Sequence, residues 1–289
     1  MQRHAGPVMA HAKELSLGSV QKTLLLPLWG RAVETGGPQP LLVDQPAAEL
    51  VGRLHCDFAN ISESIPTVVR LGWIARALHV DRAVKAYLAE RPRATIINLG
   101  CGLDTTFQRV DNGTMRWIDL DLPDVIALRS DLLPSMSRQR SLAISILDPG
   151  WIGDVDTSDG VFVVAAGVLC YFEERQVRDL LVRLARAFPG GGMVLDTFSP
   201  LGMGVSNRRV LRDSGMDAGA ALHWCIRRPR EIQHWDHAIR VVSCDGLYSS
   251  LSGRLPFSQR VGPWAVDAVG LMSAVELRFA PVPGSRRST

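Results

Sequence analysis

The sequence predicts an α/β protein built on a mostly parallel sheet, and three observations lead to this fold class. From about residue 93 onward, short apolar runs alternate with amphipathic segments. The first of these runs, residues 95–99, ends in a glycine turn that leads into a helix candidate. The segment before residue 90 lacks this alternation and is typical of helices and loops. Alternating strands and helices form βαβ units, whose strands lie parallel.

The alternation predicts individual elements. We expect strands at residues 95–99, 115–118, 142–146, 160–165, 193–198, 239–244 and 274–279. We expect the helices between them at residues 105–110, 123–133 and 173–187. The last two strands follow a long polar insertion, residues 200–236, and no obvious helix separates them, which favours a closing antiparallel pair. Before the sheet, helical spacing occurs at residues 19–33, 47–59 and 66–91.

Composition excludes several classes of protein. A chain of 289 residues with 46% apolar content can bury a full core. The net charge is only +3 and the arginines are spread along the chain, which argues against a nucleic-acid partner. We find no signal segment and no apolar run of about 18 residues, so we expect no membrane partner. Five cysteines without a C-x-x-C pair predict no metal site and a cytoplasmic, reducing location.

The glycine turn predicts a ligand. Gly100 and Gly102 follow an apolar strand, and Asp104 and Thr105 can cap the next helix. Such a turn presents free backbone N–H groups and a helix N-terminus to a nucleotide-like ligand. About twenty residues on, a second strand ends in Asp119, where a carboxylate that binds ribose hydroxyls is expected. Together these features predict a cofactor that contains adenosine.

The turn also indicates which cofactor is bound. A dinucleotide fingerprint requires a third glycine beneath the pyrophosphate, and this chain has Thr105 there. The polar pair Asp104 and Thr105 suits S-adenosyl-L-methionine, which carries no pyrophosphate. A nicotinamide-dependent dehydrogenase is the least favoured interpretation.

Two longer strings, residues 98–105 and 117–126, resemble the leucine carboxyl methyltransferase family, whose bacterial branch includes tetracenomycin-type polyketide O-methyltransferases. The further matches span roughly residues 15–200 and comprise Lys22-Thr23, Arg31-Ala32, residues 44–47, Arg76 with Asp81, residues 145–151 and residues 167–172.

The resemblance implies a class I, S-adenosylmethionine-dependent O-methyltransferase with a Rossmann-like sheet of seven strands, one of them antiparallel. It implies a single methyltransferase domain, residues 1–289, in four parts. These are an N-terminal helical cap (1–91), a cofactor-binding core (92–200), an acceptor-side lid formed by the insertion (201–236) and the closing strands (237–289).

The resemblance also implies roles for single residues. Arg76 and Lys22 would bind the methionine carboxylate of the cofactor, and Asp119 would hold its ribose. The residues bordering the rest of the cofactor would be Gly100, Gly102, Asp104, Ser145, Ile146, Asp148 and Gly167. Structural roles remain open for several of them: Arg76 as a surface charge, and Asp119 and Asp148 as turn residues.

Two positions depart from the family pattern. Thr106 stands where the family usually has arginine, and Ala166 stands where it usually has glutamate. Loss of a carboxylate beside a cationic sulfonium would weaken cofactor binding. The alternative function is therefore a methyltransferase-fold protein that binds S-adenosylmethionine or a metabolite without methyl transfer, such as a pericyclase-like or purely binding relative.

We expect a small-molecule acceptor, a polyketide-like specialised metabolite methylated on a carboxyl or hydroxyl group. A carboxylate is already ionised at neutral pH, whereas a hydroxyl calls for a general base. Tyr171 would lie near the acceptor, and the base candidates are His223, His234, His237 and Asp196. Arginines and Trp224 of the insertion are candidates to recognise an anionic aromatic acceptor. A homodimer is the assembly that we allow for.

Overall fold

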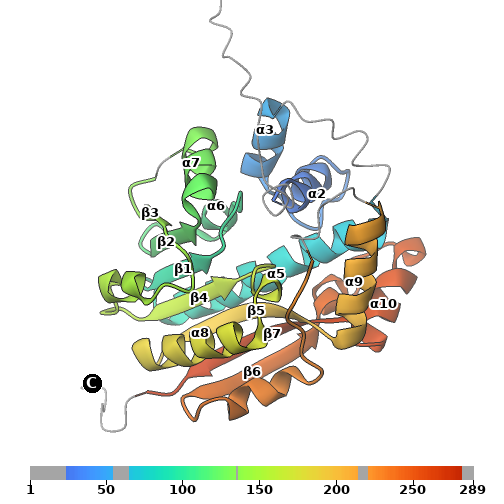
Figure 1. Ribbon diagram of the computed structural model, residues 1–289. Coiled ribbons are helices and arrows are strands. Elements are labelled where there is room, and N and C mark those ends of the chain that lie inside the picture. Colours follow the sequence, from blue (N-terminus) through green and yellow to red (C-terminus); the bar gives the residue numbers. More distant parts are fainter. Residues whose placement is uncertain (1–23, 55–64, 135, 214–220, 282–289) are drawn as a thin grey trace, which may run out of the picture.

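The computed structural model describes residues 24–54, 65–134, 136–213 and 221–281. Its centre is a seven-stranded sheet in the order β3-β2-β1-β4-β5-β7-β6 (Figure 1). The strands are β1 (Thr95–Leu99), β2 (Arg116–Asp121), β3 (Gln139–Ala143), β4 (Val161–Ala165), β5 (Gly192–Phe198), β6 (Ile239–Gly246) and β7 (Met272–Phe279).

Strand directions confirm the expected topology. Neighbours among β1 to β5 pair in parallel, whereas β7 runs antiparallel to both β5 and β6. From β1 the chain winds outward through β2 to β3, and it then returns to place β4 on the other side of β1. The connections after β1 and β4 therefore diverge at the carboxyl edge of the sheet. In open α/β sheets, this reversal point is where ligands bind.

Helices surround the sheet. The α-helices are α2 (Leu25–Thr35), α3 (Gln45–Arg53), α5 (Thr67–Glu90), α6 (Thr106–Val110), α7 (Pro123–Leu132), α8 (Glu174–Ala187), α9 (Pro200–Asp213) and α10 (Val261–Ala268). The 3-10 turns are η1 (Pro149–Asp154), η2 (Leu169–Tyr171), η4 (Pro229–His234), η5 (Leu247–Leu251) and η6 (Phe257–Gln259). The expectation of no helix between the last two strands is wrong, since α10 lies there. Gly262 and Pro263 interrupt its helical pattern in the sequence.

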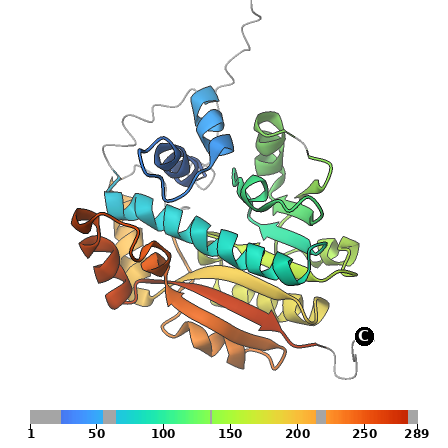
Figure 2. The same cartoon turned by 180° about the vertical axis from the view of Figure 1, so that it is seen from behind.

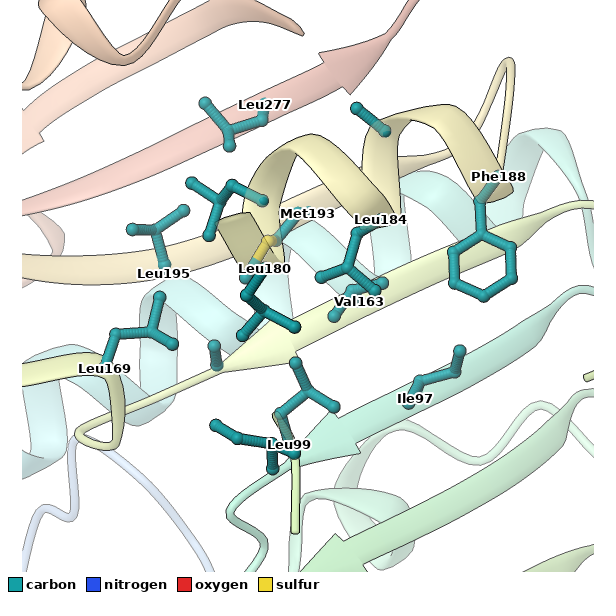
Figure 3. Packing of buried hydrophobic residues seen from close by; sticks show 14 of the residues in the cluster. Ile97, Leu99, Val163, Leu169, Leu180, Leu184, Phe188, Met193, Leu195 and Leu277 are labelled. Carbon is teal, nitrogen blue, oxygen red and sulfur yellow. The ribbon is translucent and has the colours of Figure 1, made fainter. Parts of the chain in front are cut away.

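The core has two layers because successive strand residues point to opposite faces of the sheet. On one face, Leu180 and Leu184 of α8 pack in the same cluster as Val163 and Met193 (Figure 3). On the other face, α5 and α6 cover a second cluster in which Tyr87 of α5 contacts the ring of Phe162. The strands β1 and β4 are buried along their whole length, as the continuous apolar sequence of β4 predicts and although β1 contains Thr95 and Asn98.

The helices α2 and α3 form a pair that lies above α5 (Figure 2). Leu28 and Leu50 of this pair belong to one apolar cluster with Leu103, which follows β1, and Leu128 of α7. The α2–α3 pair therefore contacts the glycine turn directly. Among the helices of the described ranges, none is long and apolar enough to cross a membrane.

Most strands differ by one or two residues from their expected bounds, and β2 and β3 differ by more. The strand expected at residues 115–118 extends to Asp121, and the strand expected at residues 142–146 is Gln139–Ala143. The strand β3 lies at the sheet edge and is at most half-buried, so polar side chains are tolerated along it. In the register between β2 and β3, Asp119 lies opposite Ser141. Apolar patterning cannot find a strand whose side chains are not buried.

Candidate functional site

The glycine turn joins β1 to α6 at the carboxyl edge of the sheet. Gly100 and Gly102 have φ values of 62° and 46°, in the left-handed region that favours glycine. A Cβ on Gly100 would lie 2.3 Å from Val168 Cγ2, in the loop that follows β4. The two diverging loops therefore touch at a position where only glycine fits.

Asp119 does not fit the expected ribose-binding role. Its side chain is fully buried. One carboxylate oxygen accepts hydrogen bonds from Trp117 Nε1 at 2.9 Å and Asn98 Nδ2 at 3.2 Å. The other accepts from Gln139 Nε2 at 2.6 Å and Arg129 Nη2 at 3.0 Å. Four donors occupy this carboxylate, and it has no surface left for a ligand.

Asp121 is the carboxylate at the actual end of β2. It is only half-buried, and it accepts hydrogen bonds from the backbone N–H groups of Gly102 and Leu122, each at 2.8 Å. Burial raises its pKa, and these two backbone hydrogen bonds oppose the rise. The expected strand end, residue 118, falls short of Asp121 because β2 is longer than its apolar run. Pro123, which begins α7, is the sequence signal that would have placed the strand end correctly.

Asp104 lies at the end of the turn, two residues after Gly102, and 26% of its side chain is exposed. It accepts hydrogen bonds from Asn98 Nδ2 and the Thr106 backbone N–H, each at 3.2 Å. Burial would raise its pKa, but the charges of Arg109 and Arg31 hold that pKa below the usual value. Asp104 is therefore ionised, and part of it faces outward from the turn.

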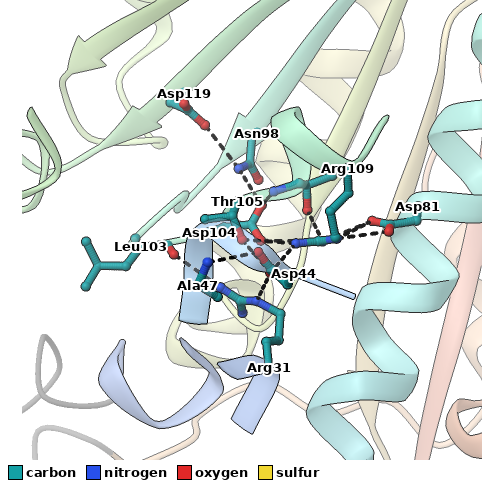
Figure 4. A network of polar contacts seen from close by, with 12 residues as sticks. Arg31, Asp44, Ala47, Asp81, Asn98, Leu103, Asp104, Thr105, Arg109 and Asp119 are labelled. Atoms are coloured by element: carbon teal, nitrogen blue, oxygen red, sulfur yellow. Dashed lines mark hydrogen bonds and ion pairs between the residues drawn. The ribbon is translucent and has the colours of Figure 1, made fainter. Parts of the chain in front are cut away.

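The departure at Thr106 is accounted for by a buried network (Figure 4). Arg109 of α6 donates to Thr106 Oγ1 at 2.7 Å, to Asp44 at 2.7 Å, and to both carboxylate oxygens of Asp81. Asp44 also accepts from Thr105 Oγ1 at 2.5 Å. Thr106 is thus a buried hydrogen-bond partner of Arg109. Through these contacts Arg109 joins α6 to α5 and to Asp44, the N-cap residue of α3.

Arg76 lies on α5 and pairs with Asp196 on β5, with 3.0 Å between Nη2 and Oδ2. The other oxygen of Asp196 accepts the Gly167 N–H at 2.6 Å. Burial alone would lower the pKa of Arg76, but the charge and hydrogen bond of Asp196, together with Cys170 and Tyr171, raise it. Asp196 thus provides a carboxylate beside the loop in which Ala166 has none. Gly167, with φ of 70°, leaves space for Arg76, since a Cβ there would lie 2.7 Å from Nη1.

The segment after β3 contains the residues expected to frame an adenine. Ile146 is buried and Ser145 is half-buried, and the Ser145 carbonyl accepts the Asp148 N–H at 3.1 Å. Asp148 is exposed and caps η1 by accepting the Gly150 N–H at 2.8 Å. Asp148 therefore acts as a turn residue, as the structural interpretation predicts. Lys22 lies outside the described residues.

On the acceptor side, η2 carries Tyr171, which is half-buried. The N–H of His223 donates to the Cys170 carbonyl at 2.8 Å, so His223 is adjacent to η2. Its ring is 49% exposed and lies 3.8 Å from Glu173 Oε1. Trp224, expected to stack on an acceptor, is instead buried in the apolar cluster beneath α8.

His234 and His237 cannot serve as the expected bases. Both precede Ile239, the first residue of β6. Because β6 is antiparallel to β7, as is β5, it runs parallel to β5, and its start lies at the opposite edge of the sheet from the glycine turn. His237 is 92% exposed, beside Asp236. The second half of the insertion thus returns along the sheet and does not form a lid over the turn.

Comparison with known proteins identifies the family. A family model described as leucine carboxyl methyltransferase matches residues 25–147. The tetracenomycin polyketide synthesis O-methyltransferase TcmP of Streptomyces glaucescens is 32% identical over 270 residues, covering 92% of this chain and 96% of that protein. The chain belongs to the leucine carboxyl methyltransferase family. The S-adenosyl-L-methionine-dependent methyltransferase dpfgK of Gibberella zeae is 31% identical to this methyltransferase over 194 residues, covering 62% of this chain and 65% of that protein.

Solved structures confirm the fold of the methyltransferase. A DUF574 family protein from Streptomyces avermitilis superposes with a TM-score of 0.60 at 15% identity, covering 89% of this chain and 97% of that one. A protein described as a methyltransferase from Thermobifida fusca gives a TM-score of 0.57 at 19% identity, covering 87% and 94%.

Sequence reasoning missed or undervalued three charged residues of this methyltransferase. The sequence predicts Asp119 instead of Asp121 as the ribose carboxylate, gives no role to Arg129, and predicts Asp196 only as a candidate base. The partners of Arg129 and Asp196 lie on other elements, ten and 120 residues away in the chain. Local spacing contains no information about either pairing.

Proposed function

We propose that this methyltransferase transfers a methyl group from S-adenosyl-L-methionine to a carboxyl or hydroxyl oxygen of a small specialised metabolite of polyketide type. The observation that carries the proposal is the 32% identity to TcmP, whose name describes O-methylation in polyketide synthesis, across 92% of this chain. The geometry supports it, because the glycine turn and Asp121 meet at the reversal point of the sheet.

The residues present suit this cofactor. Asp121 would accept the ribose hydroxyls, and the turn from Gly100 to Asp104 would border the sugar and the methionine portion. Arg76 would bind the methionine carboxylate, and its buried Nε, which has no hydrogen-bond partner among the described residues, supports this role. Ser145, Ile146 and Asp148 would frame the adenine, and Gly167 would border the sulfonium. When bound, the cofactor supplies an electrophilic methyl group on sulfur.

The acceptor would approach over η2 and the end of β5. Cys170, Phe198 and Leu222 form an apolar cluster there, against which Tyr171 packs. An apolar wall excludes water and orients an aromatic acceptor, so positioning would account for most of the rate. A carboxylate acceptor needs no base. For a hydroxyl acceptor we propose His223, next to Cys170, as the general base.

Two further properties belong to this proposal. We place the enzyme in the cytoplasm, which the free thiols of Cys101, Cys170, Cys225 and Cys244 support.

We also propose a homodimer. The exposed apolar side chains of Phe257, Val261 and Trp264 on η6 and α10 support an association surface. Light scattering on wild type and Trp264→Ser tests it, since a monomeric wild type would contradict it.

Calorimetric titration with S-adenosylmethionine, S-adenosylhomocysteine and NAD tests the cofactor, and binding of the first two alone is the expected result. Release of S-adenosylhomocysteine is then followed with a panel of aromatic polyketide carboxylic acids and phenols. Cofactor binding without turnover on any acceptor would favour the alternative of a binding protein. Absence of cofactor binding would contradict the proposal.

A further inference from the structure

Three successive carbonyl groups of the glycine turn are held by two arginines. Arg129 Nη1 donates to the Gly102 carbonyl at 3.0 Å and to the Asp104 carbonyl at 2.6 Å. Arg31 Nη2 donates to the Leu103 carbonyl between them at 3.2 Å. These contacts fix the peptide groups on which the path of the turn depends.

The two arginines reach the turn from different elements. Arg129 belongs to α7, which follows β2, and Arg31 belongs to α2 of the N-terminal cap. Each pairs with a carboxylate: Arg129 with Asp119 at 3.0 Å, and Arg31 at 2.8 Å with Asp44, which also binds Arg109. The side chains of both arginines are almost wholly buried, 4% and 7% exposed. A guanidinium suits this task because its planar fork binds a carboxylate and a carbonyl at once.

The turn needs external support. Gly100 and Gly102 adopt left-handed conformations, and glycine loses more conformational freedom on folding than any other residue. Gly102 connects this support to the ligand side: its N–H donates to Asp121 Oδ2 at 2.8 Å, and its carbonyl, in the next peptide group, accepts from Arg129. A shift of Arg129 would therefore move the turn and Asp121 together.

We propose that Arg31 and Arg129 form a carbonyl clamp that preorganises the Gly100–Asp104 turn for its ligand, with Asp119 and Asp44 as positioning residues that act through them. The proposal rests on the proposed function, in which this turn holds S-adenosylmethionine. Because Arg31 is part of the cap, the clamp links docking of the cap to the affinity of the turn for the cofactor. This linkage is reciprocal, so a bound ligand stabilises the docked cap.

The test uses Arg129→Lys and Arg31→Lys, which keep the charge but cannot span a carboxylate and a carbonyl in the same geometry. Arg93→Lys is the matched control, because Arg93 pairs with Asp159 at 3.0 Å, is 70% exposed and precedes β1 at the opposite edge of the sheet. Two quantities are measured well below the unfolding temperature of every variant. One is the affinity for S-adenosylhomocysteine, and the other is hydrogen exchange of residues 100–104 in the ligand-free protein.

We expect each clamp variant to bind at least about tenfold more weakly and to exchange faster at residues 100–104, with Arg93→Lys unchanged. The two substitutions should be less than additive in the double variant, because both loosen one turn. Unchanged exchange at residues 100–104 in both single variants would overturn the clamp. So would faster exchange together with wild-type affinity, which would mean a structural role alone. If wild type binds no cofactor, the proposed function fails, while exchange in the ligand-free protein still decides whether the arginines hold the turn.

Discussion

Arg76 Nη2 lies 3.0 Å from Asp196 Oδ2, in an ion pair whose side chains are 17% and 4% exposed. The pair links α5 to the end of β5, and Asp196 extends the link to the loop after β4 through the Gly167 N–H. One carboxylate therefore fixes the two elements that meet beside the glycine turn. The carboxylate belongs to Asp196 on β5, whereas position 166, directly after β4, is alanine.

This pair should contribute to stability through coupling that a double-mutant cycle can measure. Asp196→Asn leaves a buried guanidinium without its counter-charge, so we expect the free energy of unfolding to fall by about 3 kcal/mol. Arg76→Gln should cost a similar amount, and the double variant should lose clearly less than the sum. Urea unfolding of the four proteins gives the coupling energy. The exposed pair Arg93 and Asp159 is the control, with coupling below about 1 kcal/mol. Additive losses at Arg76 and Asp196 would contradict the inferred coupling.

Asp119 and Asp121 lie two residues apart on β2, and we expect substitutions at them to have different effects. Asp121→Ala should weaken binding of S-adenosylhomocysteine at least tenfold and abolish discrimination against its 2′-deoxy analogue. Asp119→Ala should destabilise the fold by about 3–5 kcal/mol, because Arg129 is left buried without its counter-charge. It should still discriminate between the two ligands.

Calorimetry with both ligands and urea unfolding separate these roles. If Asp119→Ala lost the discrimination and Asp121→Ala kept it, the ribose role would return to Asp119.

The residues that the sequence predicted best are those with local causes. The strand β1 and the turn after it follow from a five-residue run with three apolar residues and from two glycines, and the structure places them as expected. Likewise α8 follows from apolar residues at helical spacing, and the structure begins it at Glu174 against an expected start at residue 173.

The errors have physical causes of another kind. Asp119 is a charged residue in the middle of a buried strand, which apolar patterning interprets as a strand end. It is tolerated there because four donors satisfy it. The roles of Asp196 and Arg129 depend on partners from other elements, which only the tertiary fold brings near.

The proposed role of His223 depends on the acceptor. Its ring is half-exposed and close to Glu173, so it can exchange protons with solvent. His223→Gln should lower transfer to a hydroxyl acceptor about 100-fold. Transfer to a carboxylate acceptor should stay within about threefold, because that nucleophile is already ionised.

His237→Gln is the control and should affect neither reaction, since His237 lies at the opposite edge of the sheet. Equal losses with both acceptors would show that His223 binds the acceptor and does not act as a base.

Cys170 should make the fold sensitive to alkaline pH. Burial, reinforced by the charge of Asp196, raises the pKa of this thiol to about 12. Below its ordinary pKa of 9.0 the thiol is neutral in both the folded and the unfolded state and contributes nothing to pH dependence. Above that value the unfolded chain releases the proton and the folded chain retains it. The free energy of unfolding therefore falls, by up to about 1.4 kcal/mol per pH unit from this group.

Urea unfolding at pH 7.5, 9 and 10 checks this for wild type and for Cys170→Ala, the pH values being about one and a half units below, at and one unit above the ordinary thiol pKa. The variant should lose part of the alkaline decline, and any cavity it creates shifts its stability equally at every pH. Cys225→Ala is the control, because that thiol is only half-buried and should change the slope less. Parallel pH profiles for wild type and Cys170→Ala would contradict the raised pKa of Cys170 in the folded protein.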